Sequence, residues 1–326
     1  MYRLPAPPRG AVSVPRGGGG PALIAVAHGS RDPRSAATMA AVVAEVAAAR
    51  PDIPVRLAFL DLSTPSVDEV VDDLAAQGHT DVIVVPLLLG NAFHARVDLP
   101  ALLAEATRRH PRLRLTQAAV LGPDPLLIAA VADRVALSCR LPSLASPRSH
   151  PPVGVAATAS AHPHTLGGRI LSASRPEMPT DRASMTLPEA PSGPASLSTV
   201  TRAAGPLSDA PLGIAVAAVG SRDAAANRRT AVVARRLAAV TGCATEMCFA
   251  TVEPGIGRAV DRLRARGAER IVVAPWFLAP GLLTDRLVAA APEVAHADVI
   301  GAHSALVDVI WARYDTSVAT TLVLSA

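Results

Sequence analysis

A continuous apolar run from Val82 to Leu89, VIVVPLLL, is the feature that most constrains the fold. A run of this kind, rich in β-branched residues, predicts a strand buried on both faces of a parallel sheet. It breaks at Gly90-Asn91, and Asp98 is expected to cap the next helix with Pro100 in its first turn. Between them stands His94, a candidate site residue because open α/β sheets bind ligands beyond the carboxyl ends of their strands.

Apolar runs and helical segments alternate four times between Pro21 and Leu137. We predict strands at 22–27, 55–61, 81–89 and 113–120, and helices at 35–49, 66–76, 99–109 and 125–137. Strand–helix alternation with short connections implies right-handed crossovers between parallel strands. The predicted fold class is therefore α/β, with a parallel four-stranded sheet flanked by helices.

The same pattern returns in the last third of the chain. AVAAVGSRDA at 215–224 mirrors LIAVAHGSRDP at 24–33, with Arg222 in the place of Arg31. ARGAERIVVAPWFL at 265–278 mirrors AQGHTDVIVVPLLL at 76–89, and TVEPGIGRAVDRL at 251–263 mirrors LSTPSVDEVVDDL at 62–74. Repetition of this extent indicates two tandem domains of one fold.

The composition of the remaining segments sets the expected boundaries. Residues 1–20 are rich in Pro and Gly and lack the apolar core of a signal peptide, so we interpret them as a disordered leader. Residues 138–210, rich in Pro, Ser, Ala and Gly, are interpreted as a largely disordered linker. The two domains are then expected over 21–137 and 211–320.

Charge and composition argue against several classes of protein. The net charge is +4, but all 31 basic residues are arginine, a bias that a GC-rich genome explains, and aromatic residues make up only 2%. Nucleic-acid binding, which needs clustered cations and stacking aromatics, is not expected. No apolar run approaches the ~20 residues that span a bilayer, and the three cysteines follow no CxxC pattern. We expect a cytoplasmic protein without membrane contact.

The two repeats differ where chemistry is expected. His28 becomes Val219, Asp61 is matched with Ala250, and the region around His94 becomes GLLTDRL, with Leu283 nearest in position. The framework is kept while polar residues at strand ends are replaced. We therefore expect the first half to carry the site and the second half to form a wall beside it.

His28 and His94 both follow predicted strands, and each has a structural explanation. His28 could be an exposed residue of a turn capped by Ser30 or Asp32, or the turn could bind an anion through the free N–H groups of a helix start. Together, two imidazoles and the carboxylate of Asp61 would suit a borderline first-row metal ion, and could accept protons near neutral pH. Asp61 could instead cap a helix entry.

Cationic and hydroxyl side chains near these histidines are candidates for binding an anionic substrate: Ser30, Arg31 and Arg96. Arg31 returns as Arg222, which fits a structural role equally well, and Arg96 could be an exposed residue at a helix start. Of the other histidines, His110 is expected at a helix C-terminus.

Three motifs in this order resemble those of the sirohydrochlorin chelatases: HGSRDP (28–33), FLDLSTPSVDEV (59–70) and VPLLLGNAFHARVDLP (85–100). These are small class II chelatases of the siroheme and cobalamin branches of tetrapyrrole synthesis. The resemblance covers 21–137, with 211–320 as a degenerate copy. It implies two tandem chelatase-like, flavodoxin-like domains, and insertion of Co²⁺ or Fe²⁺ into sirohydrochlorin without nucleotide hydrolysis and without an organic cofactor.

The resemblance also implies roles for individual residues. The family's paired metal-binding histidines fall on His28 and His94, and its strand-two acid, usually glutamate, falls on Asp61, one methylene shorter. As the metal enters the macrocycle, two pyrrole protons must leave, and a histidine or Asp61 can accept them. A cleft between two lobes, with arginines at its rim, would suit a large anionic macrocycle.

Two other classes stay open on the sequence. One is a non-enzymatic carrier of metal or tetrapyrrole that uses the same histidines, and the other is a phosphate-ester enzyme that binds its substrate at HGSR. The sequence does not distinguish cobalt from iron or nickel, or the siroheme pathway from the cobalamin pathway. Two fused halves make a monomer sufficient, and a dimer is compatible with the sequence.

Overall fold

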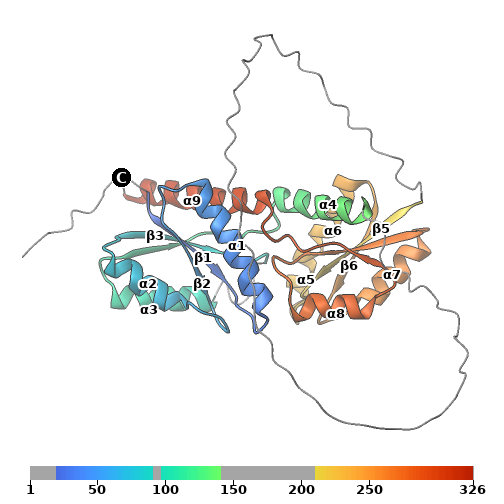
Figure 1. Ribbon diagram of the computed structural model, residues 1–326, viewed down its shortest axis with the longest axis horizontal. Helices are drawn as coiled ribbons and strands as arrows, with labels where there is room; N and C mark the ends of the chain where they lie inside the picture. Colours follow the sequence, from blue (N-terminus) through green and yellow to red (C-terminus); the bar gives the residue numbers. More distant parts are fainter. Residues whose placement is uncertain (1–19, 91–96, 141–209, 326) are drawn as a thin grey trace, which may run out of the picture. The chain divides into compact units, whose positions relative to one another are not determined.

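Two four-stranded parallel sheets form the framework of the protein (Figure 1). The computed structural model describes residues 20–90, 97–140 and 210–325, with side chains to residue 321. The first sheet has the order β2-β1-β3-β4 and is built from β1 (Ala22–Ala27), β2 (Val55–Phe59), β3 (Asp81–Pro86) and β4 (Arg114–Gln117). The second sheet has the equivalent order β6-β5-β7-β8 and is built from β5 (Leu212–Ala218), β6 (Ala244–Phe249), β7 (Arg270–Pro275) and β8 (Ala295–His296).

Helices connect and cover these strands, as the alternating pattern predicts. In the first half they are α1 (Pro33–Ala49), α2 (Val67–Ala76), α3 (Leu99–Arg109) and α4 (Pro125–Arg140). In the second half they are α5 (Ala224–Thr230), α6 (Val232–Thr241), α7 (Ile256–Ala265), α8 (Leu282–Ala290) and α9 (Ser304–Ser325). The prediction of two tandem α/β units with parallel four-stranded sheets is confirmed. None of the helices in the described ranges is long and apolar enough to cross a bilayer.

The strands end earlier than the apolar runs do. β3 stops at Pro86 instead of residue 89, because Leu88 N–H donates to the Pro86 carbonyl at 2.9 Å and turns the chain out of the sheet. β2 likewise stops at Phe59 instead of residue 61. Apolar character continues past these points because the loop residues are also packed, Leu87 being fully buried.

Helix starts follow local side-chain chemistry in two cases and not in a third. Asp32 caps α1, and Ser66 forms a capping box with Glu69 at α2. The prediction that Asp98 caps α3 is wrong. Its φ and ψ of −68° and −52° are helical, a π-type turn precedes α3, and the side chain makes no capping hydrogen bond. A capping residue needs an extended backbone for its side chain to reach the first-turn N–H groups.

The last helix of each half packs on the sheet of the other half. Helix α4, which follows the first sheet in sequence, contacts α6 and β7, whereas the C-terminal helix α9 contacts α1, β3 and β4 (Figure 1). We call the β1–β4 sheet with α1–α3 the first lobe, and the β5–β8 sheet with α5–α8 the second lobe. The exchange means that neither lobe is covered by its own half of the sequence alone.

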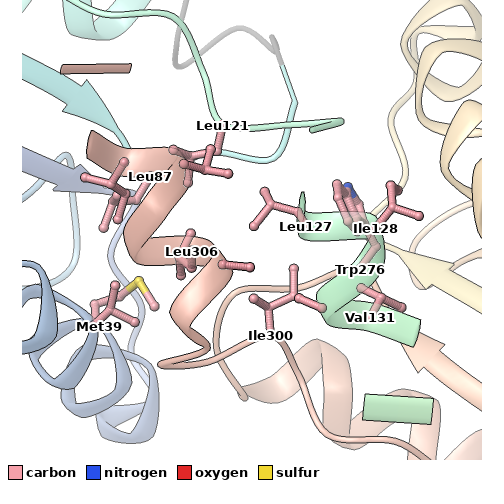
Figure 2. Close-up of a cluster of buried hydrophobic side chains, with 14 of the residues drawn as sticks. Met39, Leu87, Leu121, Leu127, Ile128, Val131, Trp276, Ile300 and Leu306 are labelled. Atoms are coloured by element: carbon pink, nitrogen blue, oxygen red, sulfur yellow. The ribbon is translucent and has the colours of Figure 1, made fainter. Parts of the chain in front are cut away.

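One continuous hydrophobic core results from this exchange. It includes alternate residues of β1 and β5 together with the inner faces of α1, α4, α6 and α9. Figure 2 shows side chains of α4 beside Trp276, and Leu306 of α9 on the side of Met39 and Leu87. The opposite faces of the two sheets have separate cores, one with α2 and α3 and the other with α7 and α8. The two lobes are thus joined by shared burial of apolar surface.

A reciprocal pair of arginines fastens the two exchanged helices. Arg134 of α4 donates to the carbonyl of Ile300, just before α9, at 2.8 Å, and Arg313 of α9 donates to the carbonyl of Leu121, just before α4, at 3.0 Å. Each arginine is the tenth residue of its helix. Arg313 also reaches the Asp124 carboxylate at 3.0 Å. The guanidinium groups satisfy carbonyls at the two crossovers that would otherwise be costly to bury.

Aromatic and charged side chains anchor α9 to the first lobe. The Trp311 indole N–H donates to the Val46 carbonyl at 3.2 Å, and the Arg50 guanidinium lies 4.3 Å from the Trp311 ring centroid. Arg50 also binds Asp315 through two nitrogens, at 2.6 and 2.7 Å. The Tyr314 hydroxyl donates to the Pro21 carbonyl at 2.6 Å, next to the start of β1. These contacts set the position of α9 against α1 and β1.

Because the core is shared, we predict that shortening a buried side chain of α9 destabilises the whole protein. Leu306→Ala should lower the free energy of unfolding by ~2–5 kcal/mol, because it leaves a cavity where a fully buried side chain stood. Leu137→Ala on α4, whose side chain is 51% exposed, should change it by less than ~0.5 kcal/mol. Urea unfolding followed by circular dichroism checks both. Two separate transitions, with only one shifted by Leu306→Ala, would contradict a common core.

The Tyr314 hydroxyl predicts a loss of stability in alkaline solution. Burial raises the pKa of Tyr314 to about 12, well above the ordinary value of about 10 for a tyrosine. The contribution of the neutral Tyr314 hydroxyl to the free energy of unfolding is therefore complete below pH 10 and is lost as the pH rises toward 12. The reason is that Tyr314 releases its hydroxyl proton at a lower pH in the unfolded chain than in the folded protein. The chain contains no lysine, but burial also raises the pKa of the Cys248 thiol to about 12, so Tyr314 accounts for part of this fall. Between pH 10 and 12 the melting temperature of Tyr314→Phe should therefore fall less steeply than that of the wild-type protein. An equally steep fall in the variant would contradict a role of Tyr314 in the alkaline loss of stability.

Candidate functional site

The carboxyl edge of the first sheet brings two predicted site residues together. His28 follows β1 directly and Asp61 follows β2 by two residues, and these strands are parallel neighbours with Ala27 opposite Phe59. The Asp61 N–H donates to the His28 carbonyl at 3.0 Å, so their backbones are adjacent. Both side chains are exposed. The sheet order alone therefore places an imidazole and a carboxylate at one edge of the sheet.

The turn after β1 is held tightly against the turn after β2. Gly29 has a φ of +94°, and a Cβ built on it would lie 1.6 Å from the Asp61 carbonyl oxygen. Ser30 N–H donates to Ser63 Oγ, and Ser63 Oγ donates back to the Ser30 carbonyl, both at 3.1 Å. Only glycine allows this approach with this backbone conformation. The two hydrogen bonds between Ser30 and Ser63 then fix the positions of His28 and Asp61.

The Asp61 carboxylate does not cap a helix. Its Oδ1 accepts the N–H of Leu62 at 2.8 Å, and the cap of α2 is Ser66. Leu62 has a φ of +61°, which is unusual for a side chain of its size. This turn projects the side chains of Asp61 and Leu62 out of the sheet edge, where both are exposed.

Two predicted site residues, His94 and Arg96, lie outside the described residues. The described chain stops at Gly90, beyond β3, and resumes at Val97, and β3 is the other neighbour of β1 in the sheet. Within residues 20–90, 97–140 and 210–325, no group of three or more His, Cys, Asp or Glu side chains could hold a metal ion. The metal site made of His28 and His94 therefore stays a prediction.

A pocket of about 410 Å³ opens next to the turn after β1, and both lobes line it. The first lobe contributes Gly29, Ser30, Arg31, Ser35 and Leu62. The second lobe contributes Val219, Phe277 and the segment 279–284 with Arg286. Two of the predicted substrate-binding residues, Ser30 and Arg31, are thus in the wall, and His28 immediately precedes it. Val219 and Leu283, which replace the histidines in the second repeat, lie in the opposite wall.

Exposed apolar side chains gather at this pocket. Leu62, Val219 and Leu282 are 50%, 45% and 61% exposed, although all three are large and apolar. Such a group is costly to leave in water, so apolar surface of this kind indicates a binding site. The pocket is therefore suited to a ligand with an extended apolar body.

Ion pairs at the edge of the pocket connect the two lobes. Arg34 of α1 binds the Asp32 carboxylate and, from the first lobe to the second, the Asp285 carboxylate of α8, each at 2.5 Å. The hydrogen bonds from Arg34 hold the pKa of Asp32 below its usual range, and those from Asp32 and Asp285 raise the pKa of Arg34. Arg31 and Arg286 also line the pocket, and neither has an ion-pair partner among the described residues. The pocket thus presents two uncompensated guanidinium groups.

The backbone hydrogen bonds correct one equivalence between the repeats. Leu60 N–H donates to Ala27 O and Asp61 N–H to His28 O, while Ala250 N–H donates to Ala218 O and Thr251 N–H to Val219 O. Asp61 therefore corresponds to Thr251, and not to Ala250 as the sequence comparison predicts. The second copy has one residue fewer before its loop proline, Pro254, which shifts the alignment by one position. The polar character of this position is kept, but not its negative charge.

Three other histidines, His110, His296 and His303, have structural partners. His110 is at the C-terminus of α3, as predicted, and its Nε2 lies 2.7 Å from an Asp72 carboxylate oxygen. His296 Nε2 lies 2.9 Å from the Ala291 carbonyl, and His303 Nδ1 accepts the Ala305 N–H at 3.2 Å. These contacts fit a role in the fold.

Sequence reasoning missed two residues that line the pocket, Phe277 and Arg286. It also missed the ion pair between Arg34 and Asp285, because these residues are 251 positions apart and nothing in either segment points to the other.

The contact between the two turns predicts a different cost for alanine at two glycines of similar φ. Gly78 (φ +86°) faces open space, so Gly78→Ala should cost only the ~1–2 kcal/mol of a left-handed residue. Gly29→Ala should cost at least ~2 kcal/mol more, since its Cβ collides with the Asp61 carbonyl. Urea unfolding of the two variants measures the difference. Equal costs would show that the turns separate easily.

Comparison with known proteins agrees with this architecture. The CbiX family model matches residues 22–138 and again residues 213–317. The chain is 34% identical over 115 residues to the sirohydrochlorin ferrochelatase of Bacillus subtilis, which is 35% of this chain and 44% of that protein. It is 33% identical over 81 residues to the sirohydrochlorin cobaltochelatase of Methanothermobacter thermautotrophicus, 25% of this chain and 56% of that protein. The aligned region thus spans about half the length of these relatives.

Solved structures share the fold over nearly the whole chain. SirB from Bacillus subtilis with Fe³⁺ superimposes with a TM-score of 0.61 at 19% sequence identity, covering 92% of this chain and 96% of that one. CbiX, described as the terminal enzyme for biosynthesis of siroheme in denitrifying bacteria, gives a TM-score of 0.53 at 20% identity, covering 89% and 98%. Because the family model matches once on each lobe and covers more than half of the chain, both lobes are copies of one unit and the chain belongs to the CbiX family.

Proposed function

We propose that this protein is a sirohydrochlorin chelatase that inserts Co²⁺ or Fe²⁺ into sirohydrochlorin without ATP, in cobalamin or siroheme biosynthesis. One observation carries the proposal. The sheet edge with His28 and Asp61 adjoins a pocket lined by both lobes, with exposed apolar side chains and two uncompensated arginines. The names of the relatives, sirohydrochlorin ferrochelatase and sirohydrochlorin cobaltochelatase, support the same activity.

The chemistry of the substrate matches this pocket. Sirohydrochlorin has a flat macrocycle with carboxylate substituents, so it combines an apolar face with negative charges at its edge. Leu62, Val219 and Leu282 would contact the macrocycle, and Ser30 and Arg31 would bind carboxylates. The open pocket would hold part of the ring, with the remainder extending toward His28. Both walls come from one chain, so the described pocket needs no second subunit.

The reaction exchanges protons for a metal ion. The metal ion is a substrate, held by the imidazoles of His28 and His94 while the macrocycle lies over it. Two pyrrole N–H bonds break, the metal–imidazole bonds break, four bonds form between the metal and the ring nitrogens, and two protons leave without any change in oxidation state. Asp61 would accept a proton, since its carboxylate is at the same sheet edge and is open to solvent, through which the proton departs. A histidine that has released the metal can accept the second proton.

The position of Asp61 limits what it can do. Its Oδ1 accepts the Leu62 N–H, which orients the carboxylate. Aspartate is also one methylene shorter than the glutamate usual at this place in the family. We therefore assign Asp61 to proton transfer, and His28 with His94 to metal binding.

The proposal predicts a large loss of activity when either histidine is removed. His28→Ala and His94→Ala should each lower kcat/KM by ~10²-fold or more. His79→Ala is the matched control, because His79 is in the same lobe but precedes β3 at the amino edge of the sheet, and it should keep normal activity. The measurement is anaerobic absorbance of sirohydrochlorin with Co²⁺ or with Fe²⁺.

Each outcome of this assay is informative. Conversion faster than the uncatalysed rate, lost in both site variants, supports the chelatase, and the faster metal indicates the pathway. Normal turnover in His94→Ala would refute the metal site. Tight binding of metal or tetrapyrrole with no acceleration by the wild-type protein would favour a carrier protein instead.

A further inference from the structure

The second lobe lacks a counterpart of His28, yet it supplies more than half of the residues that line the pocket. Among these is Arg286 of α8, which lines the same pocket as Arg31 of the first lobe. We propose that Arg286 binds a carboxylate of the tetrapyrrole, and that the second lobe thereby determines the specificity for polycarboxylate macrocycles. This inference rests on the proposed function.

The charges around α8 leave Arg286 available for a ligand. Its neighbour Asp285 is the nearest acid in sequence, and it is engaged by Arg34 at 2.5 Å. Arg34 also binds Asp32, so this side of the pocket has three arginines (Arg31, Arg34 and Arg286) and two aspartates (Asp32 and Asp285). One positive charge is left over. Arg286 is exposed and has no ion-pair partner in the described part of the chain, so it would gain most from an anionic ligand.

The local geometry directs this charge toward the pocket. The turn before α8 approaches the first lobe closely, since a Cβ on Gly281 would lie 3.9 Å from the Asp32 Cβ. Thr284 Oγ1 accepts the Gly281 N–H at 2.9 Å and donates to the Gly281 carbonyl at 2.7 Å, which fixes the start of the helix. The positive end of the α8 dipole adds to the attraction for anions.

Apolar and cationic groups in the pocket are expected to contact different parts of the ligand. Val219 and Leu282 in the second lobe and Leu62 in the first would contact the ring and tolerate many macrocycles. Arg31 and Arg286, on opposite walls, would bind substituents and distinguish a carboxylate from an uncharged group. A macrocycle that lacks charged substituents should therefore lose the contribution of both arginines.

The experiment compares ligand binding and turnover in two arginine variants. Arg286→Ala should weaken the Kd for metal-free sirohydrochlorin, measured by fluorescence quenching, by ~10-fold or more, and raise KM similarly with kcat within ~3-fold. Arg258→Ala on α7 is the control, since Arg258 is exposed and lies outside the pocket. Arg286→Lys should restore part of the affinity, because it returns the charge without the planar guanidinium.

Methyl-esterified sirohydrochlorin separates charge recognition from loss of packing. Wild type and Arg286→Ala should bind the ester with the same Kd, because the carboxylates are neutralised. An unchanged Kd for sirohydrochlorin in Arg286→Ala would overturn the inference, as would an equal loss of affinity for the ester. Failure of the proposed function would be seen separately, as absence of turnover in the wild-type protein. Urea unfolding of each variant verifies that the fold is kept.

Discussion

The exchange of α4 and α9 between the two lobes is the constraint on which the rest of the structure depends. Each helix closes a core that includes the sheet of the other half of the sequence, and the two cores merge into one. Arg134 and Arg313 reinforce the exchange by binding carbonyls at the opposite crossovers. Burial of apolar surface is not directional, so these directed hydrogen bonds are needed to select one arrangement of the helices.

This arrangement creates the pocket. Loops at the carboxyl ends of β1 and β2 form one wall, and the loop after β7 with α8 forms the other. Ligand sites in open α/β sheets usually need only one sheet edge. Here the joined lobes place two such edges against one pocket, and the Arg34–Asp285 ion pair connects them at its rim. A large, flat ligand could be contacted from both sides.

Duplication explains why the two edges differ in chemistry. The second copy keeps the turn with positive φ at Gly220, as at Gly29, but carries Val219 in place of His28 and Thr251 in place of Asp61. If His28 and Asp61 react as proposed, the second edge is free to change toward ligand binding. The apolar and cationic wall of the second lobe fits this division of labour.

Much of this protein was determined by the sequence alone, because strand and helix periodicity, turn residues and internal repetition are local properties. They predict the two parallel sheets, most element boundaries within a few residues, and the placement of His28 and Asp61 at strand ends. Asp98 was predicted wrongly because a cap depends on backbone geometry, and Asp61 was matched to Ala250 because one residue is missing from a loop.

Only the tertiary structure decided which helix covers which sheet. An amphipathic helix packs equally well on either of two similar sheets, so its sequence does not identify its partner. The same holds for the pocket, since Arg34 and Asp285 acquire a relation only when residues 251 positions apart are brought together. The sequence thus determined the two units and the sheet edge that carries His28 and Asp61, and long-range packing decided how the units combine around one pocket.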